Sequence, residues 1–169
     1  KEQHIPNAIF FDLDDNSKKN TNLPHVIVEI NEWDKIVSKM GIEKNDKVII
    51  YDNSDVISSC RCWFNFIYFG HDPKLVHILN GGLKKWLKEN KKISNEIIIG
   101  QVSSYKSFEK KKLIKSKELI DLNIDEQKFN VIDARSKERF EGKIPEPREG
   151  LRSGNIKNSF CIPFNHCLN

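Results

Sequence analysis

Long hydrophobic runs are missing from this sequence, and no apolar stretch approaches the roughly 18 residues needed to cross a bilayer. The first residues, KEQHIPNAIFFDLDD, also lack the charged and then apolar pattern of a secretory signal. A chain that begins on Lys1 is still compatible with the loss of a leader or of a larger N-terminal piece. We therefore predict that the protein has no membrane partner.

Cysteine is scarce, and its spacing argues against the common structural roles. The four cysteines form one CxC pair and one Cx5C pair: Cys60, Cys62, Cys161 and Cys167. Neither pair has the CxxC spacing of a zinc site, and without a secretory signal a disulfide framework is not expected. The histidines His25, His71, His77 and His166 show no metal-ligand spacing either. We predict reduced, mostly buried thiols and no metal site.

The charge and the motifs exclude further classes. The formal net charge is only +4, and its excess lies in KKWLKENKK and KSFEKKKLIKSK, which lack the interleaved aromatic residues of a nucleic-acid groove. The paired glycines of LNGGLKKW have no GxxxxGK or GxGxxG frame around them. We predict no nucleic-acid partner and no cofactor. The composition, 38% hydrophobic and 31% charged, is that of a soluble globular protein.

What the sequence does contain is an alternation of short β-branched runs with amphipathic stretches. NAIFF, KVIIYD and LVHIL have the character of buried parallel strands, and EINEWDKIVSKMG, SCRCWFNFIYFG and GGLKKWLKEN that of helices. After a polar stretch the pattern restarts with a helix SKELIDLNID, a strand FNVIDA, a helix SKERF and a strand SFCIPF. The fold class predicted is α/β, with central parallel sheets flanked by helices.

The restart predicts two domains. HIPNAIFFD near the start and NIKNSFCIPF near the end share a polar residue, an isoleucine, a turn and an apolar strand. We expect an N-terminal domain at residues 1–97 that lacks its start, a linker at 98–112, and the beginning of a second domain at 113–169. Both domains are expected to be truncated, which would leave strand edges exposed.

Several motifs follow one another in a recognisable order: HIPNAIFFDLDD, NLPH, YDNSDVISSCRCWFNFIYFGHD, LNGGLKKWL, VIDARSKERFEGKIPEPREGLRSGNI and IPF. Together they resemble the two-domain rhodanese family of thiosulfate and 3-mercaptopyruvate sulfurtransferases. The resemblance implies tandem rhodanese-like domains, of which the first is inert and the second carries a nucleophilic cysteine. It implies transfer of a sulfane sulfur from a small anionic donor to a thiol, cyanide or sulfite through a cysteine persulfide.

The resemblance also assigns the site. Arg139 and Arg148 match the substrate-binding pair, and Arg148 of PEPR stands where thiosulfate-preferring members commonly carry aspartate, which favours 3-mercaptopyruvate as the donor. His4 matches a histidine of a Ser-His-Asp relay, although a histidine before a strand is more often a hydrogen-bonding residue. Asp52 stands where the inert domain replaces the cysteine. None of the four cysteines matches the nucleophile, which is expected beyond Asn169.

Two alternatives remain open on the sequence alone. An inert rhodanese-like module would use its arginines to bind an anion or a partner protein without turnover. A cysteine phosphatase has less support, because SSCRCW does not supply a cysteine followed six residues later by an arginine. A cytoplasmic and a mitochondrial location would both keep a persulfide-forming thiol reduced.

Overall fold

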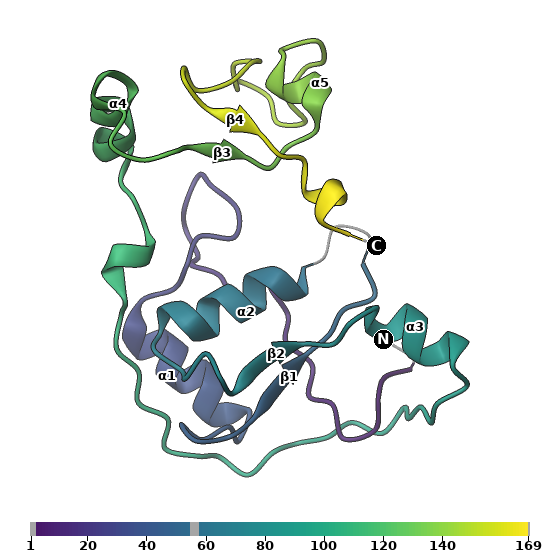
Figure 1. Cartoon of the computed structure of the whole chain (residues 1–169). Coiled ribbons are helices and arrows are strands. Elements are labelled where there is room, and N and C mark those ends of the chain that lie inside the picture. Colours follow the sequence, from purple (N-terminus) through teal and green to yellow (C-terminus); the bar gives the residue numbers. More distant parts are fainter. Residues whose placement is uncertain (1–2, 55–57, 169) are drawn as a thin grey trace. The chain divides into compact units, whose positions relative to one another are not determined.

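The computed structural model describes residues 3–54 and 58–168. The chain divides into two compact units, unit 1 (Lys1–Leu113) and unit 2 (Ile114–Asn169). Each unit contains a pair of parallel strands with flanking helices (Figure 1), so the predicted α/β class is confirmed. Residues 55–57 of the motif YDNSDVISSC lie outside the described residues.

Unit 1 alternates helices and strands in the order that the sequence predicts. Its elements are α1 (Ile30–Lys39), β1 (Val48–Ile50), α2 (Ser59–Tyr68), β2 (Val76–Ile78), α3 (Gly82–Lys88) and the 3-10 helix η1 (Lys111–Leu113). The two strands pair in parallel register, with Val48 opposite Val76 and Ile50 opposite Ile78. Helix α2 packs against both strands.

The core of unit 1 is aromatic and joins α1 to α2. Trp33 and Val37, one turn apart on α1, are completely buried, as their helical spacing requires. The Trp33 ring meets Phe66 edge-on at 5.1 Å between centroids and stacks on Phe69 at 4.9 Å. Burial of such large side chains is the dominant stabilising contribution in a small unit.

The run NAIFF was predicted to be a strand, and this prediction is wrong. No strand is assigned to residues 8–11, and the backbone of Ala8 closes a turn by donating to Ile5 O at 3.0 Å. Phe11 instead packs edge-on against Trp33 with centroids 6.1 Å apart. Phe10, by contrast, is 60% exposed. Among the described residues the run has no neighbouring strand with which to form a ladder.

The polar stretch 98–112, expected to be a linker, lies against unit 1. Tyr105 is only 1% exposed, and Ser107 N donates to the Asp34 carboxylate of α1 at 2.9 Å. The path is tight where the stretch passes the end of α1, since a Cβ on Gly100 would lie 2.6 Å from Met40 O. Glycine is therefore required at this crossing of two backbones.

A buried hydrogen-bond chain anchors this stretch. His71 is fully buried, and its ring contacts Tyr105 Oη at 2.9 Å through Nδ1 and Asp46 O at 2.9 Å through Nε2. The carbonyl of Asp46 can only accept, so Nε2 carries the proton and Nδ1 accepts from the tyrosine. The Tyr105 hydroxyl is thus the donor that satisfies a buried nitrogen.

Replacing Tyr105 with phenylalanine is expected to lower the free energy of unfolding of unit 1 by about 1–3 kcal/mol, the usual cost of a buried unsatisfied polar group. Urea unfolding followed by tryptophan fluorescence measures the change. Tyr68→Phe is the matched control, because its hydroxyl contacts Glu109 at 3.0 Å and that carboxylate is 24% exposed to water. Equal losses in the two variants would contradict the buried chain.

Unit 2 has shorter elements and no comparable core. It contains α4 (Lys117–Glu126), β3 (Ile132–Asp133), α5 (Lys137–Phe140), β4 (Phe160–Cys161) and the 3-10 helix η2 (Phe164–Cys167). Strands β3 and β4 pair in parallel, with Ile132 opposite Phe160. The buried Asn123 closes the turn from α4 to β3, since its side chain bonds both backbone groups of Phe129, at 2.8 and 3.1 Å.

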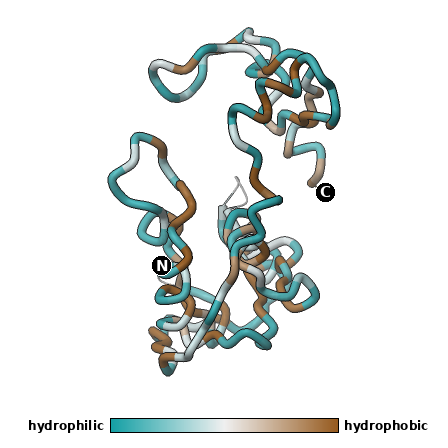
Figure 2. The backbone as a smooth tube through the Cα atoms, turned by 90° about the vertical axis from the view of Figure 1, so that its left-hand side faces the viewer, coloured by the Kyte–Doolittle hydropathy of each residue, from teal (hydrophilic) through white to brown (hydrophobic). Residues whose placement is uncertain are grey.

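Apolar side chains of unit 2 remain exposed. Ile132 and Phe160 are 59% and 58% exposed, and the buried members of the aromatic core all come from unit 1. Hydrophobic positions are interspersed with hydrophilic ones along the tube that leads to the C-terminus (Figure 2). Among the described residues, no helix combines the length and the apolar character that a membrane crossing requires.

Candidate functional site

The loop between β3 and β4 carries the arginines that the sequence singles out. Ser136 is the N-cap of α5, and its hydroxyl accepts a hydrogen bond from Arg139 N at 3.5 Å. This bond stabilises the first turn of the helix. The helix ends after four residues, and Gly142 then turns the chain with φ +73°. This short element places the Arg139 side chain at the start of the proline-rich loop.

Arg139 forms a two-point ion pair with Glu146. Its Nε donates to Glu146 Oε1 at 3.3 Å, and its Nη2 donates to Oε2. The Glu146 side chain is 5% exposed and that of Arg139 is 30% exposed. One edge of the guanidinium is therefore held by the protein, while Nη1 has no protein partner in the described part of the chain.

A second arginine, Arg135, braces the same carboxylate. Its Nη1 donates to Glu146 Oε1 at 2.6 Å, its Nη2 donates to Asp133 Oδ2 at 2.5 Å, and Nη2 also reaches Gly154 O at 2.8 Å. Two guanidinium groups and two carboxylates thus alternate in one cluster, which we call the Glu146 cluster: Asp133, Arg135, Arg139 and Glu146. The cluster ties β3 to α5 and to both ends of the loop.

The cluster stabilises its own charges. Hydrogen bonding from Arg139 lowers the pKa of the Glu146 carboxyl, and hydrogen bonding from Arg135 lowers the pKa of Asp133, in each case against the opposing effect of burial. The Asp133 carboxylate likewise raises the pKa of Arg135. At neutral pH all of these groups are charged, and opposite charges make the four-residue sum zero.

Arg148 and Arg152 differ from Arg139. Arg148 is exposed, and it makes no hydrogen bond or ion pair with any residue that the structure describes. Arg152 is also exposed and donates from Nη2 to Asn155 O at 3.4 Å. Arg139 and Arg148 therefore share one loop without sharing a partner, and their joint role in binding a substrate stays a prediction.

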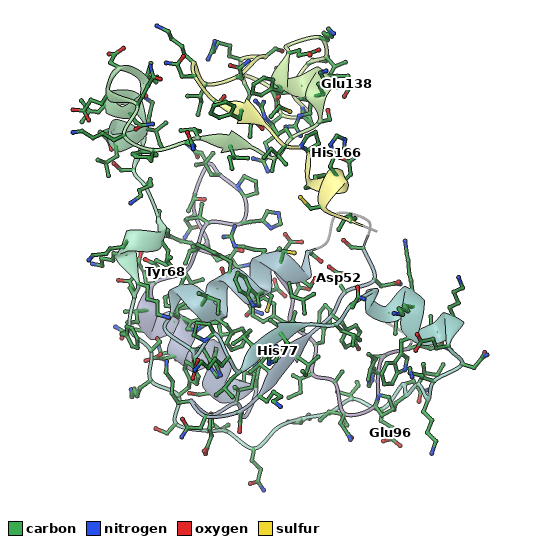
Figure 3. All side chains as sticks on the ribbon, in the orientation of Figure 1. Asp52, Tyr68, His77, Glu96, Glu138 and His166 are labelled. Atoms are coloured by element: carbon green, nitrogen blue, oxygen red, sulfur yellow. The ribbon has the colours of Figure 1, made fainter. Side chains whose placement is uncertain are left out.

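His4 lies in unit 1, and both its backbone and its ring contact backbone groups of that unit. Its backbone forms a bridge with Ser94, and its ring nitrogens lie 2.9 Å from the carbonyl oxygens of Ile5 and Glu96; Glu96 is labelled in Figure 3. Both ring nitrogens of His4 thus lie against backbone carbonyl oxygens of unit 1. This is the hydrogen-bonding alternative, and the relay role stays a prediction.

The two cysteines of unit 1 have thiols of raised pKa. Burial raises the pKa of the Cys62 thiol to about 12, and burial together with the Asp52 carboxylate raises the pKa of Cys60. A nucleophilic cysteine needs the opposite shift, since the thiolate is the reactive form. Cys161 is half-buried, with its sulfur 3.8 Å from Arg135 O, and Cys167 is exposed.

Asp52 occupies the turn from β1 toward α2 (Figure 3). Its Oδ2 accepts from Ser59 N at 2.7 Å and from the Ser58 hydroxyl at 3.3 Å. A carboxylate there satisfies free amides and complements the positive end of the helix dipole. Asp52 therefore has a structural role at the start of α2, and the inert nature of the first domain stays a prediction.

The sequence singled out Arg139 but missed the residues that hold it. Arg135 and Glu146 both lie within the quoted motif VIDARSKERFEGKIPEPREG, yet neither was assigned a role. The sequence carries no local signal for this contact, because a glutamate between two prolines is normally an exposed loop residue, and its burial against two arginines is seen only in the structure.

Comparisons with known proteins agree on one family. A rhodanese-like domain matches residues 1–89. The mitochondrial thiosulfate/3-mercaptopyruvate sulfurtransferase 1 of Arabidopsis thaliana is 36% identical over 182 residues, covering 95% of this chain and 48% of the relative. The 3-mercaptopyruvate sulfurtransferase of Mus musculus is 35% identical over 170 residues, covering 99% of this chain and 57% of the relative.

Solved structures give the same picture. The crystal structure of the Tum1 protein from Saccharomyces cerevisiae superposes with a TM-score of 0.83 and 29% identity, covering 99% of this chain and 58% of that one. This chain spans about half the length of the curated relatives that it matches.

Proposed function

Because the chain belongs to the rhodanese-like family, we propose that it takes part in moving a sulfane sulfur from 3-mercaptopyruvate, or from thiosulfate, to a thiophilic acceptor. The observation that carries this proposal is the arginine loop of unit 2, in which Arg139 is held through one edge and Arg148 is exposed and unpaired within the described residues. Two guanidinium groups of this kind suit a small anion that carries a carboxylate or an oxidised sulfur.

The reaction proposed proceeds through a cysteine persulfide. A thiolate attacks the terminal sulfur of thiosulfate or the thiol sulfur of 3-mercaptopyruvate. A sulfur–sulfur bond to the cysteine forms, and the bond from the transferred sulfur to the rest of the donor breaks. Sulfite leaves from thiosulfate, whereas the enolate of pyruvate leaves from 3-mercaptopyruvate and takes up a proton. The acceptor, a thiol, cyanide or sulfite, then removes the outer sulfur and restores the thiolate.

The four cysteines of this chain do not suit the role of nucleophile. Cys62 is buried with a raised pKa, Cys60 lies beside the Asp52 carboxylate, and neither Cys161 nor Cys167 stands where the family resemblance expects the nucleophile. We therefore place the nucleophile outside these 169 residues. The arginine loop would supply donor binding, and unit 1 would supply a domain without a reactive thiol.

The cellular location of the protein belongs to the same proposal. The mitochondrial designation is that of the Arabidopsis relative, and either a mitochondrial or a cytoplasmic compartment provides the reducing conditions that a persulfide enzyme needs.

The test compares this chain with the complete product of its gene. The complete product is expected to release pyruvate from 3-mercaptopyruvate in the presence of a thiol or cyanide, and the 169-residue chain is expected to bind the donor without turnover. Turnover by the short chain that disappears on replacing one of its four cysteines would overturn our placement of the nucleophile. Donor binding without turnover in the complete product would support the inert binding module instead.

A further inference from the structure

Arg139 is oriented by a carboxylate whose own position is fixed. Glu146 is seven residues further along the chain, and its side chain is 5% exposed although it lies between two prolines of a polar loop. Its Oε1 is shared by Arg139 Nε at 3.3 Å and Arg135 Nη1 at 2.6 Å. Because Arg135 is in turn bound to Asp133 at the end of β3, the carboxylate cannot follow Arg139 if that side chain moves.

The arrangement leaves one part of Arg139 available. Glu146 takes the edge formed by Nε and Nη2, and Nη1 is unpaired among the described residues. A free arginine side chain loses rotamer entropy when it is ordered. An arginine already fixed by the protein does not lose that entropy again when an anion binds.

Charge balance explains why the carboxylate does not abolish anion binding. Glu146 alone would cancel the charge of Arg139, but Arg135 and Asp133 complete a cluster of zero net charge. Beside this cluster the exposed Arg148 and Arg152 outnumber the exposed Glu149. The loop can therefore attract an anion while its first arginine stays fixed.

We propose that Glu146, braced by Arg135, is a positioning residue that presents Arg139 Nη1 to the donor oxyanion. This inference rests on the proposed function, since it takes Arg139 to be a ligand of the donor. It adds a role that acts through Arg139 and involves no contact between Glu146 and the substrate.

The substitution Glu146→Gln distinguishes a positioning role from a purely electrostatic one, because the two predict opposite changes in the affinity for the anion. Removing a negative charge beside an anion site strengthens anion binding if charge alone matters. Loss of a fixed Arg139 weakens binding instead. Glu149→Gln is the matched control, because Glu149 lies in the same loop, is exposed, and has no bond to Arg139.

The experiment uses the 169-residue chain labelled with ¹⁵N and titrated with thiosulfate at constant ionic strength. Arg139 Nε–Hε exchange with water and the dissociation constant are both measured by NMR, which is practical because the sequence has five arginines: Arg61, Arg135, Arg139, Arg148 and Arg152. In Glu146→Gln we expect Nε–Hε exchange to accelerate and thiosulfate affinity to fall about fivefold, less than the loss of a whole charge-assisted bond. In Glu149→Gln we expect unchanged exchange and equal or slightly higher affinity.

The outcomes distinguish the two proposals. Thiosulfate binding that is equal or tighter in Glu146→Gln, or unchanged Arg139 exchange, overturns the positioning role and leaves the proposed function standing. A wild-type chain that binds no thiosulfate removes donor binding from this loop, and the positioning role then fails together with the proposed function. If the amide signals of β3 and β4 show that Glu146→Gln does not fold, Glu146→Asp decides: the shorter acid should give a partial loss of affinity, and wild-type affinity would refute the proposal.

Discussion

Replacing Arg139 with alanine in the complete gene product is expected to lower kcat/KM by about 10- to 150-fold for 3-mercaptopyruvate and for thiosulfate alike. A hydrogen bond to a charged group contributes roughly 1.5–3 kcal/mol, and each 1.36 kcal/mol changes a rate by about tenfold. Both donors are anions, so both lose the same guanidinium. Steady-state kinetics with each donor measures the effect.

In the structure, removing the Arg139 side chain leaves its partner Glu146 with another cation. Glu146 keeps its second partner, Arg135 Nη1 at 2.6 Å, so the carboxylate is not left buried without a cation when Arg139 is removed. Arg152→Ala is the control, because Arg152 is an exposed arginine of the same loop that reaches only a backbone oxygen, at 3.4 Å. A loss confined to one donor, or an equal loss in Arg152→Ala, would contradict the role of Arg139 as a common donor ligand.

The helices were the most predictable part of the fold. Trp33 and Val37 recur at helical spacing and are both buried on α1, and Ser116 and Ser136 occupy the N-caps of α4 and α5. These features are local, so the sequence contains them directly. The strand predicted at NAIFF failed because strand formation depends on a partner elsewhere in the chain, and apolar character alone does not supply one.

Contacts distant in sequence account for the other differences. The stretch 98–112 is polar and lysine-rich, yet Tyr105 is buried because His71, 34 residues earlier, offers it a hydrogen-bond partner. The local sequence around Tyr105 does not predict that His71 is its partner. The same reason limits the site, since the contact between Arg139 and Glu146, seven residues apart with Pro145 between them, depends on the path of the loop.

The different burial and pairing of Arg139 and Arg148 were also beyond the sequence. The family resemblance separates them by donor preference, with Arg148 favouring 3-mercaptopyruvate, but says nothing of which one is held by a protein partner. In the structure Arg139 is half-buried and held by a carboxylate, whereas Arg148 is exposed and unpaired among the described residues. A fixed arginine suits a contact that every donor needs, and an exposed, unpaired one suits a contact that only the longer donor, 3-mercaptopyruvate, reaches.

That difference predicts a change of donor preference on replacing Arg148 with aspartate in the complete gene product. 3-Mercaptopyruvate carries a carboxylate at a distance from its sulfur, and an exposed guanidinium can reach that carboxylate, whereas an aspartate repels it. Loss of one charge-assisted bond, roughly 1.5–3 kcal/mol, should lower kcat/KM for 3-mercaptopyruvate by at least about tenfold.

Thiosulfate use should hold or rise in the same variant, because thiosulfate-preferring members of the family commonly have aspartate at this position. Arg148→Asp therefore should change the ratio of the two kcat/KM values, whereas Arg139→Ala should lower both values and leave their ratio nearly unchanged. Glu149→Lys is a useful counterpart, since it alters the charge of the neighbouring exposed position by the same amount in the opposite direction and should not favour thiosulfate. If Arg148→Asp shifts the ratio by less than about threefold, well below the effect of one lost charge-assisted bond, the PEPR segment acts only as a turn. Arg148 would then have no part in selecting the donor.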